Sequence, residues 1–187
     1  MPPKVRITRE EIIAAAVGLV RESGAQALNA RTVAAALQCS TQPVFSNFST
    51  MEALRAAVIE AAEVLCGEYI QRESACGDLP PYKASGMAYI RFAREERELF
   101  KLLYMRDRTD EAIPAEHRLT GQMTDLVHAN TGLEGETVQL FHLEMWAYVH
   151  GIAAMFATGY LDLDWDLVSR MLTDAYRGLR KQFGVEA

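Results

Sequence analysis

The sequence predicts an all-α protein of about nine helices, with a small three-helix head that contains a helix-turn-helix and a larger helical body. Half of the 187 residues are hydrophobic, which is enough to build a sizeable core. Apolar residues recur at three- and four-residue spacing along most of the chain, as they do on one face of an α-helix. The few strand-like runs are short and lie inside these helical patterns, so no strand is expected.

The first helix is predicted from Arg9 to Ser23. Thr8 and Glu11 have the spacing of a capping box, in which each side chain accepts a hydrogen bond from the other residue's backbone N–H. Gly24 follows at the position where many helices end. The capping box therefore predicts where this helix begins, and the glycine predicts where it ends.

The stretch from Asn29 to Phe48 predicts a helix, a tight turn and a second short helix. Asn29 is a good N-cap for the first helix, and Ser40 is expected to cap the second. Pro43 then falls in the first helical turn, where its missing N–H costs little. Val44 and Phe48 are expected to hold the second helix against the first.

A helix pair of this size is either a helix-turn-helix or an ordinary αα-hairpin inside a helical protein. In a helix-turn-helix, the N-terminal residues of the second helix enter the major groove of DNA. Thr41 and Gln42 occupy that position, and both can form hydrogen bonds with base edges.

The rest of the chain is expected to be helical with short interruptions. A second capping-box pattern, from Ser49 to Glu52, starts a long helix, and Asp164 is expected to cap the last one. The helices are expected over residues 51–72, 82–95, 97–108, 114–129, 136–158 and 165–183.

The N-terminal motifs, in this order, resemble the DNA-binding core of TetR-family (tetracycline-repressor-like) transcriptional regulators. The resemblance covers roughly residues 8–60. It rests on Thr8, Glu11, Gly24, Leu28, Arg31, Val33, Ala34, Leu37, Ser40, Phe45, Asn47, Phe48, Glu52, Ala53 and Leu54. It implies a DNA-binding domain over residues 1–50, joined by the helix 51–72 to a ligand-binding and dimerisation domain over residues 51–187.

The same resemblance, with the helix-turn-helix geometry, gives a set of candidate DNA-binding residues on the head. Thr41 and Gln42 would contact bases, and Arg31 would reach a guanine edge or a phosphate. The whole set is Arg31, Ser40, Thr41, Gln42, Phe45, Ser46, Asn47 and Thr50.

Three positions depart from the family pattern. Many relatives have tyrosine where Phe45 stands, lysine where Met51 stands and glycine where Gln38 stands. The first two changes remove a phosphate-reaching hydroxyl and a cation from the head, which bears on the strength of DNA binding.

A second informative stretch lies in the body. The spacing of Trp146, His150 and Gly151 looks like the Trp-His-Gly signature of one subclass of TetR C-terminal domains. Ala147, Gly151 and Ala154 form a strip of small residues that would let another helix approach closely. The resemblance implies a homodimer formed through the last two helices, which suits a palindromic double-stranded DNA operator.

The resemblance also implies a pocket for a small-molecule effector inside the body. Ligand pockets are mostly apolar with a few polar groups, and the body supplies such side chains. The alternative for each of them is ordinary core, and His150 could be a core histidine rather than a hydrogen-bond donor to a ligand. The candidates are Tyr69, Tyr89, Phe92, Tyr104, Met123, Phe141, Met145, Trp146 and His150.

Charge and composition narrow the possible functions. Residues 1–60 carry six cations and five anions, a charge of +1 that leaves −7 for the rest of the −6 total. The head is thus the less acidic part, and modest, salt-sensitive DNA binding is expected. Residues 1–7 could contact DNA or form a frayed terminus. No long apolar run or signal peptide is present, so we expect no membrane partner and a cytoplasmic location.

An enzyme is not expected, and neither is a cofactor or a metal. His142 and His150 are eight residues apart, about 12 Å along one helix, which is too far for one ion. The sequence contains no nucleophile elbow, phosphate loop or paired-cysteine motif.

The sequence therefore predicts a transcriptional regulator, a repressor, whose operator affinity responds to a small, largely apolar ligand. The alternative is a helical ligand sensor that no longer binds DNA and acts through a protein partner. The surface formed by Thr41 and Gln42 distinguishes the two.

Overall fold

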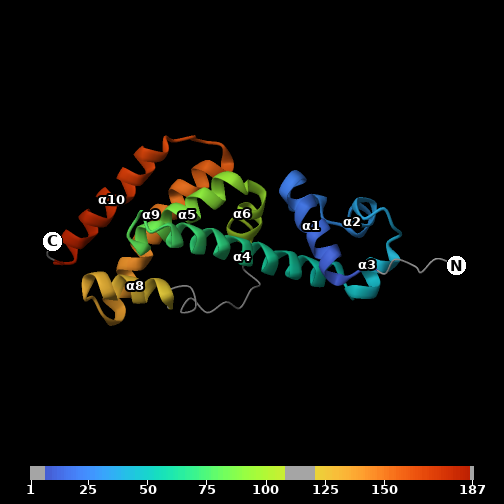
Figure 1. The fold of residues 1–187 in the computed structure, drawn as a ribbon, viewed down its shortest axis with the longest axis horizontal. Coiled ribbons are helices and arrows are strands. Elements are labelled where there is room, and N and C mark those ends of the chain that lie inside the picture. Colours follow the sequence, from blue (N-terminus) through green and yellow to red (C-terminus); the bar gives the residue numbers. More distant parts are fainter. Residues whose placement is uncertain (1–6, 108–120, 186–187) are drawn as a thin grey trace. The chain divides into compact units, whose positions relative to one another are not determined.

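The computed structural model describes residues 7–107 and 121–185 (Figure 1). These residues form nine α-helices and one 3-10 turn, and none of them is in a β-strand. The prediction of an all-α fold is therefore confirmed. No helix among the described residues is long and apolar enough to cross a membrane.

The chain folds into two compact units. The first, called the head unit here, comprises Met1–Gly67 and Glu96–Arg106, and the second, the body unit, comprises Glu68–Glu95 and Asp107–Ala187. The long helix α4 (Met51–Cys76) passes from one unit into the other, and it extends four residues beyond the expected end at Arg72. The expected domain boundary after residue 50 remains a prediction.

The head unit begins with a helix capped as its sequence predicts. The helices before α4 are α1 (Arg9–Ser23), α2 (Ala30–Ala36) and α3 (Gln42–Asn47), with the 3-10 turn η1 (Ala25–Ala27) between the first two. The backbone N–H of Thr8 donates to Glu11 over 2.8 Å, and that of Glu11 donates to Thr8 Oγ1 over 3.1 Å. Gly24 ends α1 with a φ of 78°, a backbone conformation that glycine adopts easily.

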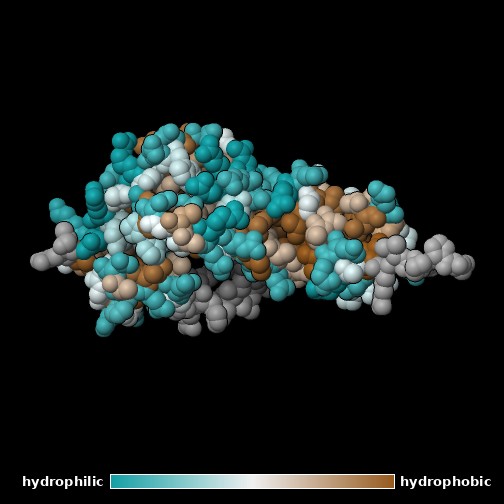
Figure 2. Space-filling model, viewed as in Figure 1, coloured by the Kyte–Doolittle hydropathy of each residue, from teal (hydrophilic) through white to brown (hydrophobic). Residues whose placement is uncertain are grey.

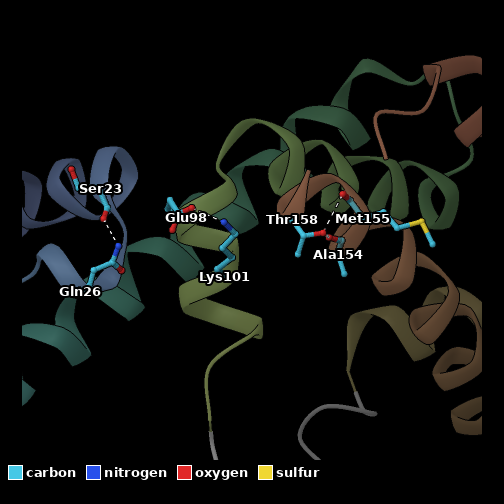
Figure 3. Close-up of polar contacts among 7 residues, drawn as sticks. All are labelled: Ser23, Gln26, Glu98, Lys101, Ala154, Met155 and Thr158. Atoms are coloured by element: carbon cyan, nitrogen blue, oxygen red, sulfur yellow. Dashed lines mark hydrogen bonds and ion pairs between the residues drawn. The ribbon is translucent and has the colours of Figure 1, made fainter. Parts of the chain in front are cut away.

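Helix α6 (Arg97–Tyr104) belongs to the head unit and packs against α1. An ion pair of 2.6 Å joins Arg21 Nε to Glu96 at the start of α6. Shorter-range contacts hold the neighbouring turns: Gln26 donates to the Ser23 carbonyl, and Lys101 pairs with Glu98 (Figure 3). The expectation that this helix extends to residue 108 was wrong, because Met105 already leaves the helical region with a φ of −116° and a ψ of 10°.

The body unit is organised around α5. Its helices are α5 (Pro81–Glu95), α8 (Gln122–Thr131), α9 (Gly135–Thr158) and α10 (Trp165–Gln182). Helix α5 contacts the other three, and Figure 1 shows it running beside α9. The expected helix 114–129 begins outside the described residues, and its described part lies in α8.

Helix α5 is buried on nearly all sides rather than on one face. Its buried residues are Ala84, Ser85, Met87, Ala88, Tyr89, Ile90, Phe92 and Ala93. The sequence indicated only Met87, Ile90 and Phe92 as inward, because small residues such as alanine are weak signals of burial. A helix with most of its central residues buried lies in the centre of its unit.

The ends of α9 and α10 are set by local hydrogen bonds. The Thr158 hydroxyl donates to the carbonyls of Ala154 and Met155 at the end of α9 (Figure 3). Asp164 accepts from the N–H groups of Asp166 and Leu167, which confirms it as the cap of α10.

Hydrophilic residues cover much of the surface visible in Figure 2, with smaller hydrophobic patches between them.

Candidate DNA-binding and ligand-binding sites

The first candidate site is built on α2 and α3. Asn29 accepts from the backbone N–H groups of Arg31 and Thr32 over 3.0 and 3.1 Å, which confirms its role as the cap of α2. Val33 of α2 and Val44 of α3 are completely buried, and Phe48 is 4% exposed. The pair is thus held together through apolar side chains, and its opposite face is left to solvent.

The turn between α2 and α3 passes through Gln38, which has a φ of 53° and is the one non-glycine residue of positive φ among those described. Helix α3 begins at Gln42, with Thr41 rather than Ser40 at the cap position. The predicted Ser40 cap was therefore wrong. Thr41 has helical backbone angles of −71° and −11° and caps nothing with its side chain, because a capping side chain needs an extended backbone at that residue.

Most of the candidate DNA-binding residues are exposed, and they lie on α2, on α3 or in the turns next to α3. Thr41 is partly buried and the others are exposed, namely Arg31, Ser40, Gln42, Phe45, Ser46, Asn47 and Thr50. The surface offers a guanidinium, an amide and several hydroxyl groups, which is the chemistry needed to bind phosphates and base edges.

Some of these polar groups are already used inside the head. The Ser46 hydroxyl donates to the Gln42 carbonyl over 2.9 Å, and Asn47 Nδ2 donates to the Pro43 carbonyl over 2.8 Å. Thr50 Oγ1 accepts from Ala53 N at the start of α4, yet its hydroxyl hydrogen can still point outward. Ser46 would have to rotate to reach a phosphate, whereas the Gln42 side chain extends from an exposed position without such a change.

The second candidate site is in the body unit, where α5 and α9 meet. The rings of Trp146 and His150 are stacked, with centroids 4.9 Å apart and an interplanar angle of 20°. Tyr89 on α5 shares a hydrogen bond of 3.0 Å with His150 Nδ1. Burial lowers the pKa of His150, so the neutral ring is favoured and Nδ1 can accept a hydrogen bond from the Tyr89 hydroxyl. Trp146 remains 40% exposed.

A second tyrosine–histidine pair, which the sequence did not indicate, joins the same two helices. Tyr82 on α5 shares a hydrogen bond of 3.0 Å with His142 Nδ1 on α9. Burial raises the pKa of Tyr82 and lowers the pKa of His142, so the tyrosine keeps its proton and its hydroxyl donates a hydrogen bond to the neutral histidine. A signal was present, because the two tyrosines are seven residues apart and the two histidines eight, two helical turns in each case.

The other candidate ligand-binding residues occupy several places. Tyr69 meets the Phe92 ring edge-on at 5.5 Å and donates to Glu95 over 2.9 Å. Met123 is partly buried on α8, and Met145 is buried on α9.

Phe141 and Tyr104 have other aromatic neighbours. Phe141 is completely buried, and its ring packs against the rings of Tyr176 in α10 and Phe183 directly after α10. Tyr104 belongs to the head unit, where its ring lies 5.0 Å from that of Phe100. The structure therefore brings together Tyr89 with Trp146 and His150, and Tyr69 with Phe92.

One face of α9 is apolar, small and exposed. Leu140 is 48% exposed and Leu143 is 38% exposed, although both are large hydrophobic residues. One and two turns further along, Ala147 is exposed, and a Cβ atom added to Gly151 would meet no other atom within 4 Å. This face has the shape that close helix–helix packing needs.

Among the described residues, no three His, Cys, Asp or Glu side chains are grouped as metal ligands would be.

Comparison with solved structures shows the class of protein to which this fold belongs. A TetR-like transcriptional regulator from Rhodococcus sp. RHA1 aligns with a TM-score of 0.69 and 18% identity over 96% of this chain and 98% of that one. A TetR-family member from Streptomyces coelicolor A3 aligns with a TM-score of 0.63 and 20% identity over 89% and 96%. The multidrug binding protein EbrR, complexed with imidazole, aligns with a TM-score of 0.62 and 20% identity over 89% and 88%. The chain thus has the fold of TetR-like transcriptional regulators.

The family model of the tetracyclin repressor-like C-terminal domain matches residues 82–176, which span α5 to α10. The chain belongs to the TetR family. This match does not by itself assign the chain to the Trp-His-Gly subclass that the sequence suggested, and that finer assignment stays a prediction. No curated protein matches the sequence. Because the family consists of regulators, the expectation that the chain is not an enzyme is confirmed.

Proposed function

We propose that this protein is a cytoplasmic transcriptional repressor that binds a palindromic operator as a homodimer and responds to a small, largely apolar ligand. Residues 1–50 would form the DNA-binding domain and residues 51–187 the ligand-binding and dimerisation domain. The observation that carries the proposal is the exposed polar face of α2 and α3, held by a completely buried apolar face.

The base-reading part of this face consists of Thr41 and Gln42. A glutamine amide can form two hydrogen bonds with an adenine edge in the major groove, and a threonine hydroxyl can pair with either base type. Arg31, exposed at the start of α2, would contact a guanine edge or a phosphate. Asn47 and Thr50 would contact phosphates, which fix the position of the head on DNA without reading its sequence.

The exposed face of α9 supports the homodimer. Two copies related by a two-fold axis would cover Leu140 and Leu143 with their own equivalents, while Ala147 and Gly151 would let the helices approach closely. Such a dimer presents two heads, as a palindromic operator requires.

The contact of Tyr89, Trp146 and His150 supports a ligand site in the body. It combines an aromatic surface with polar groups, a pattern common to small-molecule sites. The structurally similar protein EbrR is a multidrug binding protein, which fits a small-molecule ligand for this protein. A ligand acts by binding one arrangement of the dimer more tightly than the other, and couplings of about 1–3 kcal/mol are usual.

The DNA-binding part of the proposal is tested by selecting duplexes from a random-sequence pool with the full-length protein. The wild type should enrich a palindromic sequence. Replacing Thr41 and Gln42 by alanine should weaken binding to that sequence by about tenfold or more, because a good base contact discriminates by about 1–3 kcal/mol. Gln71→Ala, at an exposed position of α4 in the body unit, is the matched control and should bind like the wild type.

Sedimentation of the same proteins checks that every variant remains a dimer. If the wild type enriches no sequence, the proposed repressor function is refuted. The alternative function, a ligand sensor that acts through a protein partner, would then remain.

The ligand-binding part is tested with a panel of apolar compounds, ranked by the shift they cause in melting temperature. The best compound should weaken operator binding by the wild type. Trp146→Ala should reduce this response while leaving operator affinity without ligand nearly unchanged. A loss of operator affinity with an intact response would instead make Trp146 a structural residue.

A further inference from the structure

We propose that Phe45 reads the methyl group of a thymine in the major groove, within about one base pair of the base contacted by Gln42. The inference rests on the proposed function and assigns part of its sequence specificity to an apolar contact. It follows from the position of one exposed aromatic ring on an otherwise polar surface.

Phe45 lies on the same side of α3 as the two proposed base-reading residues. Its backbone N–H donates to the Thr41 carbonyl, so it follows Thr41 by one helical turn. It follows Gln42 by three residues, a spacing that also places side chains on one face. The Phe45 ring is 52% exposed.

The ring of Phe45 is not needed to hold the head together. Val44, which is completely buried, and Phe48, which is 4% exposed, anchor α3. The Phe48 ring is also covered by the Arg9 guanidinium, 4.9 Å from its centroid. Phe45 makes no comparable ring or cation contact with any other residue that the structure describes.

A phenyl ring has no donor or acceptor, so it gains nothing from a phosphate oxygen. In the major groove, the apolar group available to it is the C5-methyl of thymine, and phenylalanine is one of the residues that suit this contact. Among the described residues of the head unit, the other large hydrophobic residues that are exposed, Val64 and Met105, lie on α4 and directly after α6, away from α3 in the sequence. Single exposed apolar residues are common on proteins, and only the one beside Thr41 and Gln42 is placed to contact a base.

The geometry of the helix gives the distance between the two contacts. Three residues rise about 4.5 Å along an α-helix, and successive base pairs are about 3.4 Å apart. The thymine read by Phe45 is therefore expected at the base pair next to the one read by Gln42. Because glutamine pairs best with adenine, each half-site should contain two adjacent A·T pairs.

The experiment uses the operator selected with the full-length wild-type protein and replaces its thymines one at a time by deoxyuridine, which lacks only the C5-methyl. One position in each half-site should weaken wild-type binding by about fourfold, as expected for one methyl group removed from an apolar contact. Phe45→Ala should bind the thymine and deoxyuridine duplexes equally, and Phe45→Leu should keep part of the difference.

Val64→Ala is the matched control, because it truncates an exposed apolar residue of the head unit that lies on α4. It should keep the full fourfold preference for thymine. Since the Phe45 ring is half exposed, Phe45→Ala should also keep the wild-type melting temperature within the range usual for surface substitutions.

Two results would overturn the inference in different ways. If the wild type binds its operator but is insensitive to deoxyuridine at every position, and Phe45→Ala weakens all duplexes alike, the ring contacts the sugar–phosphate backbone. The proposed function would then stand and the inference would fail. If the wild type selects no sequence, the proposed function fails first and the inference falls with it.

Discussion

The hydrogen bonds inside the head unit and those inside the body unit differ in how far apart their partners lie along the chain. In the head, the caps of α1 and α2 are hydrogen bonds between residues two or three positions apart, such as Thr8 with Glu11 and Asn29 with Arg31, although Arg21 and Glu96 also pair over 75 positions. In the body, two tyrosine–histidine hydrogen bonds join residues far apart, such as Tyr82 with His142, 60 residues away. The first kind is set by local sequence, and the second forms only when two helices have already packed.

This difference has an energetic consequence. A capping bond is worth about 1 kcal/mol, because water competes for the same groups. A large aromatic side chain buried between helices is worth several times more, because its loss leaves a cavity as well as a lost transfer free energy. Truncation of a buried aromatic residue such as Phe141 in the body should therefore cost more than loss of a cap such as Asn29 in the head.

The largest effect is expected from Phe141→Ala. Phe141 is completely buried and its ring lies 5.6 Å from that of Tyr176. Its truncation should lower the free energy of unfolding by about 3–5 kcal/mol. The measurement is urea unfolding followed by tryptophan fluorescence, which reports on the body because both tryptophans, Trp146 and Trp165, lie there.

Tyr160→Ala is the control for this prediction. Tyr160 is 77% exposed in the turn after α9, so its truncation should change the free energy of unfolding by less than about 0.5 kcal/mol. Equal effects of the two substitutions would mean that the body is not held by the packing seen around Phe141.

The sequence predicted the local features of the head well. The caps at Thr8 and Asn29 and the end of α1 at Gly24 are confirmed, because each depends on residues within one turn. The cap of α3 was misplaced by one residue, because Thr41 occupies the cap position with helical backbone angles and without a capping hydrogen bond, which a capping preference does not predict.

The long-range features of the body could not be predicted in the same way. The ranges of α5, α9 and α10 were right to within about one residue, which is normal for helix ends. Which tyrosine meets which histidine depends on how α5 and α9 are aligned, and no pattern within either helix fixes that alignment. Sequence patterns also grouped Tyr104 with the body aromatics in one pocket, although Tyr104 folds with the head unit.

The second prediction is that mild acid lowers the free energy of unfolding of the body and leaves that of the head unchanged. Burial lowers the pKa of His142 and His150 below the ordinary 6.5, so the unfolded chain binds protons more readily than the folded one. The stabilisation is complete above the unfolded pKa and is lost as the pH falls through the lower folded pKa. The free energy of unfolding of the body should therefore fall between about pH 7 and 5.5, before the carboxylates titrate.

The measurement is urea unfolding by tryptophan fluorescence at each pH, for the wild type and for a variant with both His142→Gln and His150→Gln. The variant should lose most of the pH dependence in this range, whatever its stability at pH 7. The sequence of the head unit contains no histidine, so far-UV circular dichroism of any separate head transition should show no such dependence. The same acid sensitivity in the variant would assign it to other groups.

The third prediction concerns the cap of α2. Asn29→Ala removes the acceptor for the N–H groups of Arg31 and Thr32 and should cost about 1 kcal/mol. Because the cap lies in the head, circular dichroism should show the loss while the tryptophan-detected transition of the body stays in place. Asn29→Ser, which can cap in the same way, should restore most of the stability. An equal shift of both signals would show that head and body unfold as one unit.

The smallest effect, and the one with the opposite sign, is expected at the turn between α2 and α3. Gln38 is exposed and has a φ of 53°, a conformation that costs a side chain of this kind about 1 kcal/mol and glycine almost nothing. Gln38→Gly should relieve this strain, and the greater entropy of the unfolded glycine chain should offset part of it, which leaves a gain of about 0.5 kcal/mol. Gln38→Val should be destabilising, since a β-branched residue tolerates positive φ least. Thermal unfolding of the three proteins, monitored by circular dichroism, should therefore rank glycine above glutamine and glutamine above valine. If the glutamine protein is instead more stable than the glycine variant, the glutamine side chain stabilises the turn by an interaction that outweighs the backbone strain. The stability of the head would then not be limited by the backbone conformation of this turn.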